Sequence, residues 1–68
     1  MPMKAKEMVK LLLANGFVFD RQKGSHAIYV NPETNRIIVV PMHAKELKKG
    51  TEQQILKDAG LKGGSEHE

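Results

Sequence analysis

The sequence predicts an α+β domain in which the elements follow the order α-β-β-β-α, with a three-stranded antiparallel sheet and both helices on one face of it. Two amphipathic helical segments enclose three strand-like segments, and the links between those strands are too short for a parallel crossover. A chain of 68 residues holds one core of this kind. We assign a single domain to residues 1–61 and expect the small polar residues 62–68 to form a disordered tail.

The first helix is expected from about Met3 to Ala14. Its apolar side chains recur at the i, i+3, i+4 and i+7 spacing of one helical face, and they are Ala5, Met8, Val9, Leu12 and Leu13. Lys6 and Lys10 fall on the opposite face. The helix should end at Asn15-Gly16, because glycine adopts the left-handed conformation without a Cβ clash.

Three strands are expected over residues 17–22, 26–31 and 36–40. In the first, Phe17 and Phe19 should share one face. The residues Lys23-Gly24-Ser25 indicate a turn, and the segment 31–35, with Pro32 and two asparagines, indicates a hairpin loop. The unbroken apolar run of the third strand, residues 37–40, predicts burial on both of its faces.

A basic connector that contains Lys45, Lys48 and Lys49 leads to the second helix. We expect this helix to open at Gly50-Thr51, with Thr51 and Gln54 forming a capping box. It should end at Gly60-Leu61, which repeats the glycine-then-apolar pattern that ends the first helix.

Composition excludes several classes of protein. There is no cysteine, which rules out disulfides, thiolate metal sites and a cysteine nucleophile. The longest apolar run is four residues, and no charged-then-apolar leader follows Met1, so we expect a cytoplasmic domain. The net charge of +3 and the pI near 9.4 favour a polyanionic partner.

No cofactor or metal site is predicted. The three histidines, His26, His43 and His67, have no metal-ligand spacing, and neither a phosphate-binding glycine loop nor a dinucleotide motif occurs. One constellation remains, at the junction of the first two strands: Arg21-Gln22-Lys23-Gly24-Ser25-His26.

This segment combines the groups that a phosphodiester site needs. Arg21 and Lys23 supply positive charge, and the backbone amides of Gly24 and Ser25 favour an anion. His26 supplies a side chain that exchanges protons near neutral pH. By local sequence alone, an ordinary turn followed by a solvated histidine explains the segment better. A structural loop histidine likewise explains His43.

Motifs along the whole chain resemble the HicA (YcfA-like) family of bacterial toxins. The matching segments are Asn15-Gly16-Phe17, Lys23-Gly24-Ser25-His26, Val39-Val40-Pro41-Met42-His43, Lys45-Glu46-Leu47-Lys48-Lys49-Gly50-Thr51 and Ile55-Leu56-Lys57-Asp58-Ala59-Gly60-Leu61. The resemblance covers residues 3–61. It departs at Ala27, where many members have a polar or aromatic residue.

The resemblance implies a fold similar to double-stranded-RNA-binding domains and the activity of an mRNA interferase, an endoribonuclease that blocks translation. It assigns His26 as the catalytic histidine, and Arg21, Lys23, Gly24 and Ser25 would hold the phosphate. His43 is a candidate second proton-transfer group. No metal or other cofactor is implied, since the RNA 2′-hydroxyl is itself the nucleophile. The implied partners are mRNA and a HicB-like antitoxin.

Two alternatives remain open at this point. A non-catalytic RNA-binding module would use the same lysines for affinity, with His26 as one more contact. A protein-binding adaptor would neither bind nor cleave RNA.

Overall fold

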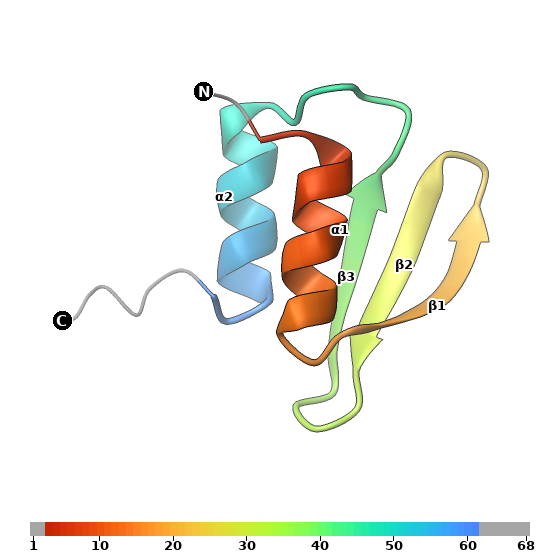
Figure 1. The fold of residues 1–68 in the computed structure, drawn as a ribbon, viewed down its shortest axis with the longest axis vertical. Helices are drawn as coiled ribbons and strands as arrows, with labels where there is room; N and C mark the ends of the chain where they lie inside the picture. The colour runs from red at the N-terminus through yellow and green to blue at the C-terminus, as the bar shows by residue number, and fades with distance from the viewer. Residues whose placement is uncertain (1–2, 62–68) are drawn as a thin grey trace, which may run out of the picture.

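The computed structural model describes residues 3–61. Its elements are α1 (Ala5–Ala14), β1 (Val18–Lys23), β2 (His26–Asn31), β3 (Arg36–Pro41) and α2 (Lys49–Asp58). The strands form one antiparallel sheet in the order β1-β2-β3. Both helices pack against β3, and the β1–β2 hairpin extends beyond them (Figure 1). The α-β-β-β-α prediction is confirmed, whereas the predicted tail lies outside the described residues.

The two helix ends predicted from glycines are confirmed. Gly16 has a φ of 90° and Gly60 a φ of 75°, both in the left-handed region. At the end of α1 the N–H of Phe17 donates to the carbonyl five residues earlier, at 3.0 Å, and the N–H of Leu61 makes the same bond at 2.9 Å at the end of α2. These bonds satisfy carbonyls that the helices leave without a partner.

The two helix starts differ from the prediction. Helix α1 begins at Ala5 rather than Met3, because Lys4 is extended and forms an antiparallel bridge with Glu46. Helix α2 begins at Lys49 with Lys48 as its N-cap, and no side chain caps it. The capping box of Thr51 and Gln54 is therefore wrong. Because the chain is already helical from Lys49, Thr51 lies inside the first turn of α2 and not at its N-cap.

The prediction that β3 is buried on both faces is also wrong. Ile38 and Val40 are 2% and 0% exposed and lie in the core, but Ile37 and Val39 are 65% and 45% exposed. Successive strand residues point to opposite faces, and both helices cover the same face of a single sheet. The other face of β3 is consequently open to solvent despite its apolar side chains.

The first strand is shifted by one residue, to Val18–Lys23, and its two aromatic residues differ in burial although both lie on the side of the sheet that faces the core. Phe17 precedes the strand and is 2% exposed, whereas Phe19 is 55% exposed. Phe19 packs edge-on against Tyr29, with ring centroids 5.6 Å apart. It is exposed because the β1–β2 hairpin extends beyond the helices (Figure 1).

Candidate active site at the end of the sheet

The tight turn between β1 and β2 places Lys23 beside His26. The turn itself contains two residues, Gly24 and Ser25, and Gly24 has a φ of 57°, which suits glycine at the first position of a two-residue hairpin turn. Lys23 and His26 are direct cross-strand partners, so their side chains leave the same face of the sheet. Both residues are exposed. The imidazole of His26 is therefore accessible to a large ligand.

His26 lies on the face of the sheet that the helices leave uncovered. Its neighbours in β2, Ala27 and Tyr29, alternate with it into the core. Arg21 pairs with Ile28 and shares the uncovered face with His26. The guanidinium of Arg21 also forms an ion pair with Asp20, which offsets its charge.

The strand ladder brings His43 to His26. Pro41 pairs with His26 at the end of β3, and the backbone N–H of Met42 then donates to the carbonyl of Ser25 at 2.7 Å. The ring centroids of His26 and His43 lie 6.0 Å apart, with an angle of 64° between the ring planes. His43 is exposed as well, so the structure places two accessible imidazoles at one end of the sheet.

The lysines near this end of the sheet form no ion pair with a carboxylate of the described residues. Within residues 3–61, the only ion pair is the one between Arg21 and Asp20. Lys23 has no carboxylate of the described residues within ion-pair distance, and the same holds for Lys6 and Lys45. An anion at this end of the sheet would thus meet uncompensated positive charge.

A hollow of about 340 Å³ lies directly beside His43. Its lining residues come from the start of α1 and from the loop between β3 and α2, and they are Lys4, Ala5, Lys6, Met42, His43, Ala44 and Lys45. The sequence contains no local signal for this hollow, because its two walls are far apart in the chain. In the described part of the chain, no three His, Asp or Glu side chains gather as a metal site.

The predicted site residues are largely brought together. Lys23, Gly24, Ser25 and His26 form one continuous turn, and His43 lies next to it. Arg21 is on the same face, but it is the member whose charge is already paired. The roles of these residues in binding and catalysis stay predictions. Among residues 3–61, no helix is long and apolar enough to cross a membrane.

Two exposed histidines beside unpaired lysines, on a small α+β domain, define a candidate acid–base site for a phosphate-containing ligand. The chain matches the family model described as the HicA toxin of bacterial toxin–antitoxin systems over residues 5–61. It therefore belongs to the HicA toxin family, whose members pair with antitoxins. A search of curated proteins found no match to the chain.

Proposed function

We propose that this protein is the toxin of a type II toxin–antitoxin system and cleaves mRNA in the cytoplasm, as a metal-independent endoribonuclease that blocks translation. The observation that carries the proposal is the pair of accessible imidazoles, with ring centroids 6.0 Å apart, next to Lys23. Membership of the HicA toxin family supports the toxin role. His26 is the catalytic histidine in this proposal.

The chemistry needs only groups that RNA and this site supply. One imidazole removes the proton of the 2′-hydroxyl, whose oxygen attacks the adjacent phosphorus. The bond from phosphorus to the 5′-oxygen breaks, and a second group donates a proton to that oxygen. His26 takes one of these roles, and His43 is the candidate for the other. The products are a 2′,3′-cyclic phosphate and a 5′-hydroxyl.

Positive charge and backbone donors would stabilise the phosphorane-like transition state. Lys23 lies on the same face as His26, and the amides of Gly24 and Ser25 belong to the turn between them. Donors fixed before the reaction stabilise developing charge without the cost of reorganising water. Arg21 would contribute less than Lys23, because Asp20 already pairs with it.

A HicB-like antitoxin is the proposed protein partner, and the uncovered face of the sheet supports this assignment. Val18, Ile37 and Val39 are between 45% and 65% exposed, and the cross-strand register places them on the face that carries His26. Exposed apolar patches bordered by charge are typical of protein interfaces. An antitoxin with an acidic border around an apolar centre would bury this patch and cover His26 together.

The experiment compares the wild-type protein with the His26→Ala variant on a labelled single-stranded RNA in excess EDTA. We expect the wild-type protein to cleave, and the variant to cleave about 10²- to 10⁴-fold more slowly because general acid–base help is lost. Replacing the 2′-hydroxyl at the cleaved linkage by hydrogen should prevent cleavage. His67→Ala, which removes a histidine to which the proposal gives no role, is the matched control.

Three results would contradict the proposal. They are cleavage by His26→Ala at the wild-type rate, strict dependence on an added divalent metal, and cleavage of the linkage that lacks the 2′-hydroxyl. Wild-type protein that binds the RNA tightly but never cleaves it would instead identify the non-catalytic RNA-binding module, which the exposed lysines also fit.

A further inference from the structure

The hollow beside His43 is held open by backbone bonds between distant segments. Leu47 donates its N–H to the carbonyl of Met3 at 2.8 Å, and Lys4 forms an antiparallel bridge with Glu46. Leu47 is 2% exposed and anchors this contact in the core. The loop between β3 and α2 is therefore fixed beside the start of α1.

The same loop is also tied to the turn that carries His26. The N–H of Met42 donates to the carbonyl of Ser25 at 2.7 Å, and the next residue, His43, lines the hollow. The hollow, His43 and His26 thus follow one another along the end of the sheet. A strand of RNA whose phosphodiester lies at the histidines would place a neighbouring nucleotide at the hollow.

The lining of the hollow separates into an apolar part and a cationic part. Met42 and Ala44, which are half-buried, provide apolar surface, and the exposed Lys4, Lys6 and Lys45 provide charge. The volume of about 340 Å³ is at the small end of the range for ligand sites, which suits one nucleotide rather than several. A nucleotide has the matching division into a flat base and a charged phosphate.

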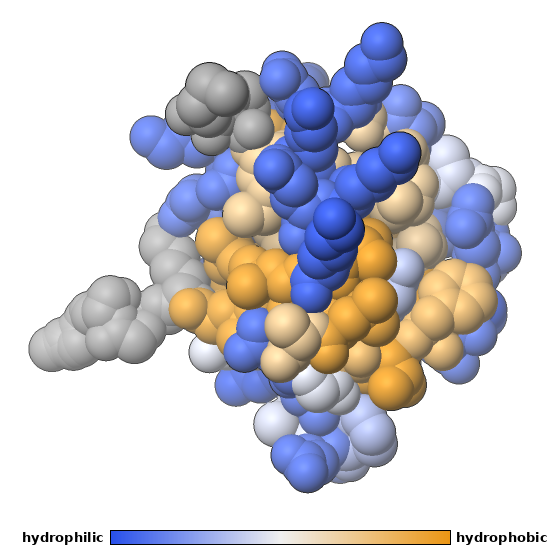
Figure 2. Space-filling model, in the orientation of Figure 1, coloured by the Kyte–Doolittle hydropathy of each residue, from blue (hydrophilic) through white to orange (hydrophobic). Residues whose placement is uncertain are grey.

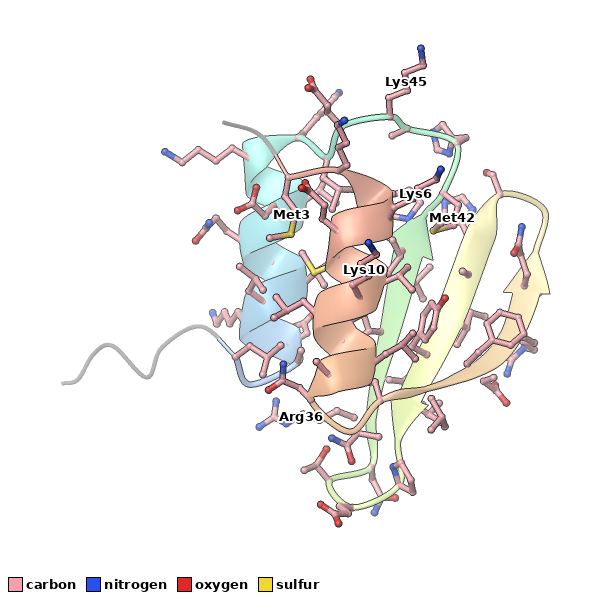
Figure 3. All side chains as sticks on the ribbon, viewed as in Figure 1. Met3, Lys6, Lys10, Arg36, Met42 and Lys45 are labelled. Carbon is pink, nitrogen blue, oxygen red and sulfur yellow. The ribbon has the colours of Figure 1, made fainter. Side chains whose placement is uncertain are left out.

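The lysines continue from the hollow along α1. Lys45 lies on the loop above α1, Lys6 lies near the start of the helix, and Lys10 lies one turn further along it (Figure 3). Residues four apart on a helix have Cβ atoms about 5–6 Å apart, so Lys6 and Lys10 can contact neighbouring phosphates of one strand. Hydrophilic side chains project from this face of the molecule over a more apolar surface (Figure 2).

We propose that this hollow is the subsite for the nucleotide next to the cleaved phosphodiester, with its phosphate on Lys6 and Lys45 and its base against Met42 and Ala44. Lys10 contacts the following phosphate. The inference rests on the proposed ribonuclease function and adds the direction in which the RNA leaves the histidines. In this arrangement the substrate crosses from the end of the sheet onto the exposed side of α1.

The test uses the variants Lys6→Ala and Lys45→Ala, singly and together, with Lys57→Ala as the matched control. Lys57 is an exposed lysine in the last turn of α2, and it does not line the hollow. Binding of a single-stranded RNA is measured by fluorescence anisotropy in the His26→Ala background, which prevents cleavage. Cleavage kinetics are measured with His26 intact.

We expect each lysine of the hollow to behave as a phosphate contact. Such a contact contributes about 0.7 to the slope of log affinity against log salt for a single strand, which is about five-fold in affinity at 0.1 M salt. Because Lys6 and Lys45 contact the same phosphate, the double variant should raise Kd and KM about five-fold and lower the slope by about 0.7. Each single variant should have a smaller effect in the same direction. Lys57→Ala should change either constant less than two-fold.

An RNA with an abasic residue beside the cleaved linkage tests the apolar part of the subsite. Two abasic RNAs are compared, each lacking the base on one side of the cleaved linkage. We expect the RNA that lacks the base on the side entering the hollow to bind the wild-type protein more weakly than the intact RNA. Removal of the base on the other side should have a smaller effect. Equal effects on both sides would overturn the assignment of a base to this hollow.

The outcomes separate this inference from the proposed function. If wild-type protein cleaves but Lys6→Ala and Lys45→Ala behave as Lys57→Ala does, the subsite is wrong and the ribonuclease proposal stands. If wild-type protein does not cleave, the anisotropy measurements still test the subsite as an RNA-binding surface. If the protein binds no RNA, both proposals are overturned.

Discussion

Removal of the His43 imidazole tests whether the site works with two histidines. The rings of His26 and His43 have centroids 6.0 Å apart, and both are accessible. At this separation a phosphodiester can contact both rings at once, one through the 2′-oxygen and the other through the 5′-oxygen. His43→Ala should therefore slow the chemical step, although the His26 side chain and the lysines are still present.

The expected magnitude follows from proton transfer. One positioned acid or base contributes about 10²- to 10⁴-fold, which corresponds to about 3–5 kcal/mol of transition-state stabilisation. Stability should change by no more than about 0.5 kcal/mol, because His43 is an exposed loop residue. A large loss of kcat with an unchanged melting temperature is thus the predicted combination.

The assay is single-turnover RNA cleavage across a range of pH. A site with one base and one acid gives a bell-shaped profile, because protonation of the base lowers the rate at low pH and deprotonation of the acid lowers it at high pH. Each histidine variant should lose one limb of this profile, and the two variants should lose different limbs. A 5′-thio leaving group, which needs no acid, should restore cleavage to only one of the two variants.

The reasoning is refuted if His43→Ala cleaves within two-fold of the wild-type rate and keeps the bell-shaped profile. The same holds if the 5′-thio substrate restores neither variant while both remain folded. A purely structural role for His43 would lower stability and leave the shape of the pH profile unchanged.

Two further predictions concern the fold and the partner surface. Gly60→Ala should lower the melting temperature on the order of 5–10 °C, because a left-handed residue other than glycine costs about 1–2 kcal/mol and the new Cβ would lie 3.2 Å from the Arg36 guanidinium carbon. Gly50→Ala, whose Cβ meets nothing within 4 Å, should raise the melting temperature slightly, and equal losses for both would contradict this. Ile37→Asp should weaken antitoxin binding about ten- to hundred-fold, from the lost burial of an apolar side chain, while RNA cleavage is retained. Leu13→Asp, at a 50% exposed residue of α1, is the control, and an equal loss of antitoxin binding there would refute the assignment of the partner surface.

Local chemistry explains the parts of the fold that the sequence predicted well. The glycines at 16 and 60 end the two helices because the backbone there needs a positive φ, and this requirement is visible in the sequence. The turn at Gly24-Ser25 follows from the same property. Asn35, with a φ of 60°, shows that an asparagine in the second hairpin loop also takes the turn conformation that was expected.

The errors arise where a local pattern has two structural outcomes. The run Ile37–Val40 is equally compatible with a strand buried on both faces and with one covered on a single face, and the packing of both helices on one side decides between them. Likewise, Thr51 and Gln54 have the spacing of a capping box, but α2 begins two residues before Thr51. Neither outcome is encoded within the segment itself.

The sequence by itself determined the order of the elements, the positions of the turns and the presence of a histidine next to a basic turn. Only the tertiary structure decided that His43 lies beside His26, because this proximity depends on the register of β2 and β3 and on the bond from Met42 to Ser25. It also decided that Lys6 and Lys45 line one hollow, since the bond from Leu47 to Met3 joins two segments that are far apart in the sequence. Helix and turn signals act over a few residues, whereas these neighbours are set by strand pairing and by the burial of a shared core.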